Sequence, residues 1–150
     1  MAPMPVRVQT EDFDLGQELD ALRAGRTDIG ALVSFTGLVR DTGDGTLADM
    51  TLEHYPGMTE RALGQIFADA SKRWDLQAGL IIHRYGTLKP GDQIMMVAAA
   101  SKHRQNAFEA ASFMMDFLKS RAPFWKKERG ADGSVWVDAR EQDEAARDRW

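Results

Sequence analysis

Four cationic side chains surround one Pro-Phe-Trp corner in the last third of the chain. Lys119 and Arg121 precede this corner, and Lys126, Lys127 and then Glu128 follow it. If the aromatic side chains of this corner are buried, they can hold the aliphatic part of a lysine side chain away from water. Both desolvation and neighbouring cations lower the pKa of a lysine amine. An amine that is partly neutral near neutral pH can act as a base or a nucleophile. The cluster is therefore a candidate site, with a solvated surface cluster as the alternative.

A second basic group stands where the longest helix is expected to start. The run is Ser101-Lys102-His103-Arg104. The first turn of a helix presents free backbone N–H groups and the positive end of the helix dipole, so it already favours an anion. Further positive side chains at this end are costly unless something negative binds there. The run predicts an anion site, and neutralisation by Asp or Glu from elsewhere in the chain is the alternative.

The two basic groups are too far apart to share one small ligand within one chain. His103 and Lys119 are 16 residues apart in one predicted helix, which places them about 24 Å apart at 1.5 Å per residue. Either they belong to separate sites, or a symmetric dimer brings the helix start of one protomer to the lysines of the other.

The remaining candidates are weaker on their own. Arg40 ends the predicted strand 29–40 before a glycine-rich turn, where a charge is commonly just solvated. That turn, residues 41–46, lacks the Lys-Ser/Thr and the following helix of a phosphate loop. His54 and His83 lie in strand patterns without a second ligand at short spacing, so both are interpreted as structural and no metal site is expected.

Composition restricts the classes of function. The chain has 150 residues, 43% of them hydrophobic, and no cysteine, which predicts a single domain over residues 1–150. The lack of cysteine excludes disulfides, thiolate metal sites, iron–sulfur clusters, cysteine nucleophiles and a protein-bound persulfide. The N-terminus lacks the apolar region of a signal peptide, and no apolar stretch reaches membrane-helix length. A cytoplasmic protein that does not enter membranes is expected.

The net charge of −4 is unevenly distributed. Residues 101–130 carry seven Lys and Arg against three Asp and Glu, and the other 120 residues carry 12 against 20. A basic segment inside an acidic chain argues against a nucleic-acid-binding surface and for a local anion site.

The apolar periodicity and the turn residues predict an α+β fold, mainly an antiparallel sheet with packed helices. Helices are expected from the cap Asp14 to about residue 24, from the cap Thr59 to Trp74, and from the cap Ser101 to residue 121, before Pro123. Strands are expected at residues 6–8, 29–40, 51–56, 78–88, 93–101 and 134–139, with a hairpin turn at 89–92, a basic loop at 124–130 and a short amphipathic tail.

Six motifs in order resemble one known family over nearly the whole chain. They are FTGLVR (35–40), LEHYPGMTE (52–60), HRYGTLKPGD (83–92), ASKHR (100–104), AFEAASFMMDFLKSRAPFWKKE (107–128) and WVDAR (136–140). Together they resemble the large, catalytic subunit of molybdopterin synthase. The resemblance implies an α/β-hammerhead fold and conversion of a cyclic pyranopterin monophosphate, precursor Z, to molybdopterin, without a cofactor or a metal.

The resemblance also implies two protein partners. Sulfur would arrive as a thiocarboxylate on the C-terminal Gly-Gly tail of a small ubiquitin-like subunit, and two large subunits would form the central homodimer of a heterotetramer. The absence of cysteine agrees with this picture, because a chain without thiols must receive its sulfur from another protein.

Carried onto this sequence, the family's catalytic lysines fall on Lys119 and Lys126. Its substrate-binding positions fall on Leu38, Val39, Arg40, His103, Arg104, Lys119, Lys126, Lys127 and Glu128, and Phe35, Met115 and Arg140 are further pocket candidates. Arg40, His103 and Arg104 would bind the phosphate, with the last two coming from the partner protomer. Some family members carry a basic residue in place of Leu38. The uncharged Leu38 side chain cannot take over that role, so the expected substrate contact at this position is the backbone. Two alternatives stay open, namely a non-catalytic binding module and a lysine Schiff-base enzyme.

Overall fold

The computed structural model describes residues 5–131, 133–137, 146–148 and 150. These residues form two four-stranded sheets, with strand orders β1-β4-β6-β2 and β5-β3-β7-β8. The first contains β1 (Val6–Gln9), β4 (Ala78–Arg84), β6 (Gln93–Ser101) and β2 (Ala31–Leu38), and the second contains β5 (Gly86–Leu88), β3 (Asp49–His54), β7 (Phe124–Gly130) and β8 (Gly133–Val137). All pairs are antiparallel except β1 with β4. The predicted α+β fold with a mainly antiparallel sheet is confirmed.

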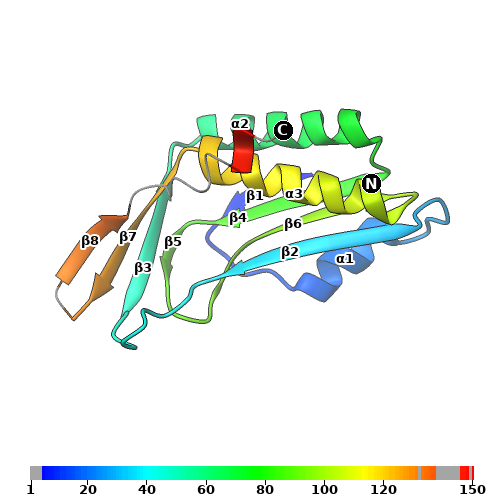
Figure 1. Ribbon diagram of the computed structural model, residues 1–150. Helices are drawn as coiled ribbons and strands as arrows, with labels where there is room; N and C mark the ends of the chain where they lie inside the picture. The colour runs from blue at the N-terminus through cyan, green and yellow to red at the C-terminus, as the bar shows by residue number, and fades with distance from the viewer. Residues whose placement is uncertain (1–4, 132, 138–145, 149) are drawn as a thin grey trace.

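Three helices cover the first sheet. Figure 1 shows α2 (Met58–Trp74) and α3 (Arg104–Arg121) on one face and α1 (Leu15–Arg23) on the other, with the second sheet to the side. One apolar cluster joins α2 and α3 to the sheet, a second joins α1 to it, and a third lies at the second sheet. Burial of these three clusters is the main favourable contribution to folding.

The side chains of the central strand β6 have to be small as well as apolar. Residues 95–100 are completely buried, and three of them are alanines. Gly79 on the neighbouring β4 packs against Phe67 of α2, where an added Cβ would come within 2.6 Å of the ring. Ala99 and Gly79 thus allow α2 and α3 to approach one face of the sheet closely, whereas Ala98 belongs to the cluster that joins α1 to the other face.

The strand predicted at residues 78–88 is interrupted. It divides at Tyr85 into β4, in the first sheet, and β5, in the second. Gly86 has φ of 94°, a conformation that is easily reached only without a Cβ. The turn predicted at residues 89–92 is present, because the Asp92 N–H donates to the Lys89 carbonyl at 2.9 Å, and β4 pairs antiparallel with β6. The prediction is wrong in one respect, because the strand that leads into the turn is β5 of the second sheet and does not pair with β6.

The basic loop predicted at residues 124–130 is also wrong, because this segment is strand β7. It pairs with β3 on one side and β8 on the other. Its charged residues are poor strand formers, but these two pairings satisfy the backbone and override that preference. Because neighbouring residues of a strand face opposite sides, Lys126 and Glu128 share one face and Lys127 lies on the other.

Of the three predicted helix caps, Asp14 is confirmed, whereas Thr59 and Ser101 are wrong. Asp14 caps α1 as expected, because its carboxylate accepts a hydrogen bond of 3.0 Å from the backbone N–H of Gln17. The cap of α2 is Gly57, whose N–H donates to the Glu60 carboxylate at 2.6 Å. Thr59 lies inside the helix, and its hydroxyl donates to the carbonyl of Tyr55.

The predicted cap of α3 is displaced by two residues. Ser101 ends β6, and the cap position is His103. The Ser101 hydroxyl accepts from the His103 N–H at 3.1 Å and donates to the His103 carbonyl at 2.7 Å. These two bonds fix the turn between β6 and α3.

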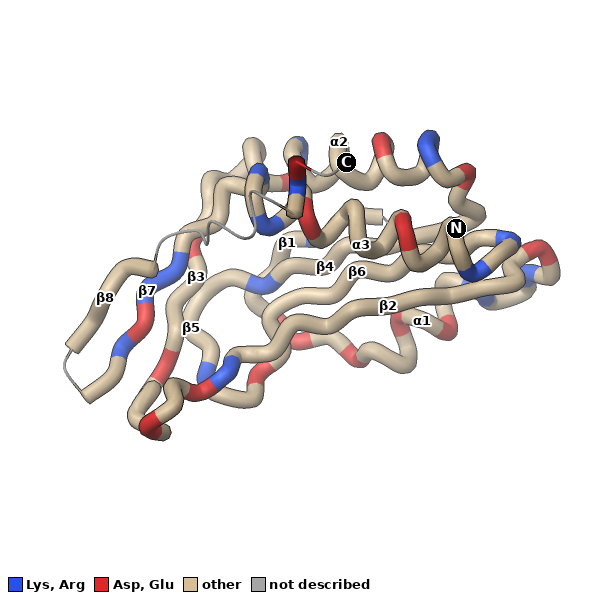
Figure 2. Tube along the Cα trace, viewed as in Figure 1, with Lys and Arg blue, Asp and Glu red and all other residues tan. Residues whose placement is uncertain are grey.

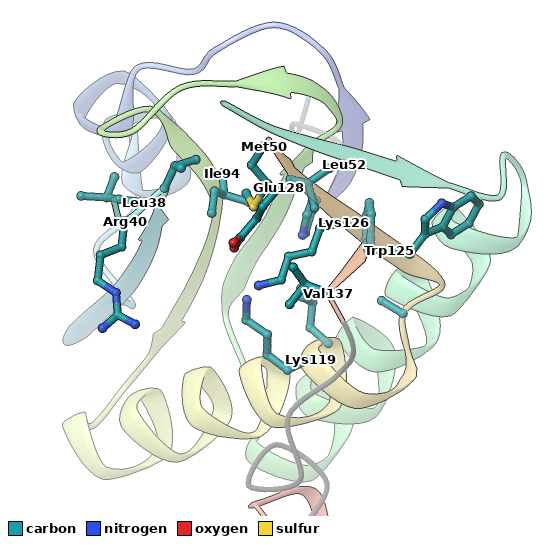
Figure 3. Close-up of a pocket in the computed structure, with 15 residues that line it drawn as sticks. Leu38, Arg40, Met50, Leu52, Ile94, Lys119, Trp125, Lys126, Glu128 and Val137 are labelled. Carbon is teal, nitrogen blue, oxygen red and sulfur yellow. The ribbon is translucent and has the colours of Figure 1, made fainter. Parts of the chain in front are cut away.

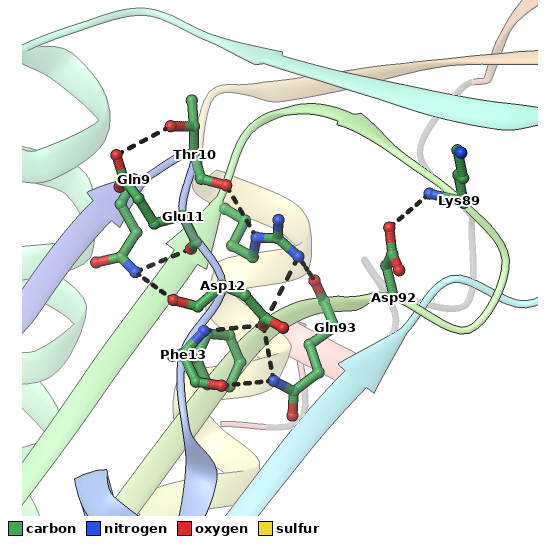
Figure 4. Close-up of polar contacts among 9 residues, drawn as sticks. Gln9, Thr10, Glu11, Asp12, Phe13, Lys89, Asp92 and Gln93 are labelled. Atoms are coloured by element: carbon green, nitrogen blue, oxygen red, sulfur yellow. Dashed lines mark hydrogen bonds and ion pairs between the residues drawn. The ribbon is translucent and has the colours of Figure 1, made fainter.

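One polar network ties the segment between β1 and α1 to the first sheet (Figure 4). The Arg84 guanidinium donates to the carbonyls of Thr10 at 3.1 Å and Gln93 at 2.9 Å. The Gln93 amide donates to the Asp12 carboxylate and the Phe13 carbonyl, both at 2.8 Å. The hydrogen bond from Gln93 is the main reason why the pKa of Asp12 lies below its usual value.

Candidate active site

A pocket of about 380 Å³ lies where the second sheet meets the C-terminal end of α3 (Figure 3). Its charged or titratable lining residues are Arg40, His83, Lys119, Lys126 and Glu128. The rest of the lining is apolar or aromatic and consists of Leu38, Val39, Met50, Leu52, Ile94, Leu118, Ala122, Phe124, Trp125 and Val137. A concave, mostly apolar pocket with a few converging polar groups is the usual form of a small-molecule site.

Lys119 and Lys126 meet in this pocket although they come from different elements. Lys119 stands in the last turn of α3, where a cation complements the negative end of the helix dipole. Lys126 lies on β7, between Leu52 of β3 and Val137 of β8. In Figure 3 both amino groups extend into the same open space. The structure thus brings together the two lysines that flank the Pro-Phe-Trp corner.

The pocket lining carries more positive than negative charge. Lys119, Lys126 and Arg40 are cationic, and Glu128 is the one acidic residue among the lining residues. Figure 2 shows basic positions on β7, near the end of α3 and after β2, and these segments contribute Lys126, Lys119 and Arg40 to the pocket lining. Cations gathered around one concave site raise the local positive potential and attract anions.

Arg40 stands at the pocket's edge on a fixed backbone. The preceding residue, Val39, is 4% exposed, donates its N–H to the Asp92 carbonyl at 2.9 Å, and accepts from the Gly91 N–H at 2.8 Å. In Figure 3 Arg40 lies across the pocket from the two lysines. Leu38 is 56% exposed, so its side chain is open to solvent.

Among the charged or titratable lining residues, His83 is the one that the sequence did not indicate as part of a site. Its ring stacks on Phe124 with 3.7 Å between the ring centroids and 18° between the planes. Burial is the main reason why the pKa of His83 falls to about 3, and the positive charge of Lys119 lowers it further. The contact joins β4 to β7, which belong to different sheets, so no sequence spacing could have indicated it.

Several predicted site residues lie outside the pocket. His103 and Arg104 are exposed at the opposite end of α3, Phe35 is 46% exposed on β2, and Met115 packs against the cluster under α2 and α3. The amino group of Lys127 lies 5.5 Å from the ring centroid of Trp136, on the other face of β7. Arg140 falls outside the described residues.

The start of α3 also has an acidic neighbour. The charge of Lys102 contributes to lowering the pKa of Asp28, although the main cause is the hydrogen bond from Arg26. Asp28 is thus already paired with Arg26 at 2.7 Å. It offsets Lys102 only in part, and the exposed His103 and Arg104 remain available to an anion.

Neither a metal cluster nor a membrane helix is found among the described residues. No group of three His, Asp or Glu side chains in the described part of the chain is placed to hold a metal ion. Within those same residues, no helix is long and apolar enough to cross a membrane.

Comparison with known proteins assigns the chain to a family. The family model described as "MoaE protein" matches residues 8–121. The molybdopterin synthase catalytic subunit of Ralstonia nicotianae is 60% identical over 146 residues, which cover 97% of this chain and 83% of that protein.

Solved structures agree with this assignment. The molybdopterin biosynthesis MoaE protein of Burkholderia ambifaria superposes with a TM-score of 0.83 at 54% identity, over 97% of this chain and 96% of that one. A complex of subunits 1 and 2 of the molybdopterin-converting factor of Helicobacter pylori shares the fold, with a TM-score of 0.77 at 19% identity over 91% and 92% of the chains. The chain therefore belongs to the MoaE family of molybdopterin synthase catalytic subunits.

Proposed function

We propose that this enzyme acts in the cytoplasm and transfers sulfur to the cyclic pyranopterin monophosphate precursor Z, producing the dithiolene of molybdopterin. The sulfur comes from a thiocarboxylate at the C-terminal Gly-Gly tail of a small ubiquitin-like subunit. Membership of the MoaE family supports the reaction class. The observation that carries the proposal is the pocket in which Lys119 and Lys126 face the same space.

The lysine pair suits a thiocarboxylate donor. A thiocarboxylate is an anion, and ammonium groups hold anions through charge-assisted hydrogen bonds. Lys119 contacts the incoming tail and moves a proton during transfer, whereas Lys126 holds the substrate and polarises its reacting carbon. Lys126 is half-buried and Lys119 is exposed at the pocket mouth, so an incoming anionic tail can reach Lys119 from solvent.

The phosphate of the substrate requires further cations. Arg40 lies across the pocket from the lysines and is the cation of the same chain best placed for this task. His103 and Arg104 stand at the other end of the 18-residue helix α3, so they can reach a lysine pocket only from a second protomer. A central homodimer with two shared sites satisfies this requirement.

A reconstitution assay tests this function. The enzyme is mixed with precursor Z and a small subunit that carries the thiocarboxylate, and dithiolene product is measured. The wild-type enzyme should form product, and Lys119→Ala should lower the rate by about 10²–10⁴-fold, the usual contribution of general acid–base catalysis. Binding of the small subunit should survive in Lys119→Ala. A wild-type enzyme that binds the subunit without forming product would instead be a binding module.

A further inference from the structure

Arg40 is the pocket cation whose orientation no neighbouring side chain explains. It lies across the pocket from Lys119 and Lys126 (Figure 3). Arg40 is exposed, and none of the hydrogen bonds, ion pairs and ring contacts in the described part of the chain involves its guanidinium. The direction of this side chain is therefore set by the backbone that carries it.

The backbone next to Arg40 is held from both sides. Val39, the preceding residue, donates its N–H to the Asp92 carbonyl at 2.9 Å and accepts from the Gly91 N–H at 2.8 Å. Its side chain is buried in the apolar cluster at the second sheet. Because the backbone and the side chain of Val39 are both fixed, the point from which the Arg40 side chain extends is fixed as well.

The turn that makes these two contacts is closed by Asp92. The Asp92 N–H donates to the Lys89 carbonyl at 2.9 Å, and the Asp92 carboxylate accepts from the Lys89 N–H at 2.8 Å (Figure 4). Pro90 and Gly91 occupy the central positions, and the φ of 94° at Gly91 is typical of a type II turn. The Asp92 side chain thus holds in place the two backbone groups that bind Val39.

A β-bulge brings this turn beside the pocket. Between Gly37 and Leu38 the pairing of β2 with β6 shifts by one residue, so that Ile94 has no partner on β2. A bulge bends its strand and redirects side chains, and bulges are common next to active sites. Ile94 packs against the same cluster as its neighbour Met95 and lines the pocket, although regular alternation would place the two on opposite faces.

We propose that Asp92 is a positioning residue for Arg40: its carboxylate holds the turn that fixes Val39, and so keeps the Arg40 guanidinium directed into the pocket toward an anionic group of the ligand. The negative charge of Asp92 by itself weakens the attraction of anions to this region. The turn thus uses Asp92 as a hydrogen-bond acceptor and not as a charge. That the anion is the phosphate of the substrate rests on the proposed function, whereas the action of Asp92 through Arg40 does not.

Two variants of equal charge test this distinction. Asp92→Asn keeps an oxygen that can accept from the Lys89 N–H, and Asp92→Ala does not. The substrate-free protein is titrated with inorganic phosphate, and the Nε–H resonance of Arg40 in ¹H–¹⁵N NMR spectra gives the dissociation constant. We expect Asp92→Ala to bind phosphate about three- to tenfold more weakly than wild type, a smaller loss than that of a whole charge-assisted hydrogen bond. Asp92→Asn should bind at least as tightly as wild type.

Asp14→Ala is the matched control. The Asp14 carboxylate also accepts from a backbone N–H, that of Gln17 at 3.0 Å, but it does so at the start of α1, on the other face of the first sheet (Figure 1). This variant loses the same charge and a similar hydrogen bond, yet its phosphate binding should be unchanged. The proposal is overturned if Asp92→Ala binds phosphate as tightly as wild type, if Asp92→Asn binds as weakly as Asp92→Ala, or if phosphate does not shift the Arg40 resonance of the wild-type protein.

The reconstituted enzyme shows whether Asp92 acts through Arg40. Asp92→Ala should raise KM with kcat nearly unchanged, as expected when an interaction that holds substrate and transition state equally is weakened. In an Arg40→Ala background the same substitution should raise KM no further, because the group that it positions is absent. An equal rise of KM in both backgrounds would show an effect on the fold alone and would contradict the proposal.

Gly91→Ala disturbs the same turn without touching Asp92. The φ of 94° at Gly91 is strained for any residue with a Cβ, so this variant should also weaken phosphate binding and raise KM. Wild-type values in Gly91→Ala, with the turn shown by NMR to be altered, would separate the turn from Arg40 and overturn the proposal. If the phosphate titrations behave as expected while the wild-type enzyme forms no dithiolene, the proposed function fails and the positioning role of Asp92 stands.

Discussion

Phe124 lies flat against His83, with 3.7 Å between the ring centroids, and this contact links the first residue of β7 to β4 in the other sheet. Lys126 follows Phe124 by two residues on the same strand and therefore on the same face. The stack thus fixes the position of β7 over the pocket, and with it the position of Lys126.

Replacement of Phe124 by Ala should disturb both stability and activity. Loss of a partly buried aromatic ring should lower the free energy of unfolding by about 2–3 kcal/mol, somewhat less than for a fully buried Phe. Urea unfolding measures this loss, and the rate of the reconstituted enzyme should fall because Lys126 is no longer held in place. Phe108→Ala is the control, because Phe108 is 60% exposed, and its effect should stay within about 0.5 kcal/mol. Equal losses in the two variants would contradict the role of the stack.

The buried His83 should make the protein sensitive to mild acid. The pKa of His83 is about 3 in the folded state, against 6.5 for an unperturbed histidine, chiefly because of burial. Between these values the unfolded chain binds a proton that the folded protein does not, so the free energy of unfolding falls as the pH falls from about 6.5. The slope approaches about 1.4 kcal/mol per pH unit.

Urea unfolding of wild type and His83→Gln between about pH 7 and 4.5 measures this slope. Carboxylates with lowered pKa values, such as Asp12 and Asp49, lose their contribution only at lower pH. The variant should therefore show a flatter dependence in this window. Parallel curves for the two proteins would argue that His83 titrates normally.

Neighbouring lysines on β7 should differ sharply in their effect on turnover. Lys126 lines the pocket, whereas Lys127 lies over the ring of Trp136 on the opposite face. Lys126→Met should lower kcat/KM by about 10²-fold or more, as for a group that stabilises developing charge, and Lys127→Met should change it by less than about threefold. The two variants have the same net charge, so long-range electrostatics cancel in the comparison. A comparable loss in Lys127→Met would place substrate on the other face of β7.

Close packing of α2 on β4 depends on the missing side chain of Gly79. An added Cβ would come within 2.6 Å of the Phe67 ring and 3.0 Å of the Ala98 carbonyl oxygen. Gly79→Ala should therefore lower the free energy of unfolding by about 1–3 kcal/mol through overpacking. Gly64→Ala is the matched control within α2, where a Cβ meets nothing within 4 Å, and it should stabilise by about 0.5–1 kcal/mol through helix propensity. Thermal or urea unfolding shows whether each variant is less stable or more stable than the wild-type protein.

The sequence predicted those features that depend on local chemistry. Asp14 could be recognised as a helix cap because a cap is a property of a few consecutive residues. The strand character of residues 124–130 could not be recognised, because it arises from pairing with β3 and β8, which are distant in sequence or follow later in the chain. The break at Tyr85 was hidden for a similar reason, since the apolar pattern continues while the chain passes to the other sheet.

The same distinction applies to the pocket. The two lysines were indicated by their spacing around the Pro-Phe-Trp corner, and the structure brings them together. His83 looked structural because its environment depends on Phe124 and Lys119, which lie more than 30 residues further along. The opposite orientation of Lys126 and Lys127 became visible only when the segment proved to be a strand.

The shared-site hypothesis can be tested by mixing inactive enzymes. His103 and Arg104 begin α3 and Lys119 stands in its last turn, so one chain cannot bring both groups to one small substrate. If each site combines the lysines of one protomer with the helix start of the other, a dimer of one Arg104→Ala and one Lys119→Ala protomer contains one intact site and one doubly altered site. At equal mixing about half of the dimers are mixed, so activity should return to about a quarter of the wild-type value.

Mixing the double variant Arg104→Ala/Lys119→Ala with wild type provides the opposite control. In that mixed dimer both sites are altered under the shared-site arrangement, so activity should fall below the value expected from dilution. If each site belonged to one chain, the mixed dimer would retain one wild-type site, and the fall would match dilution alone. Subunit exchange is verified independently with two differently tagged proteins. Proven exchange without any recovery in the single-variant mixture would therefore show that Arg104 of one protomer does not complete the site that contains Lys119 of the other.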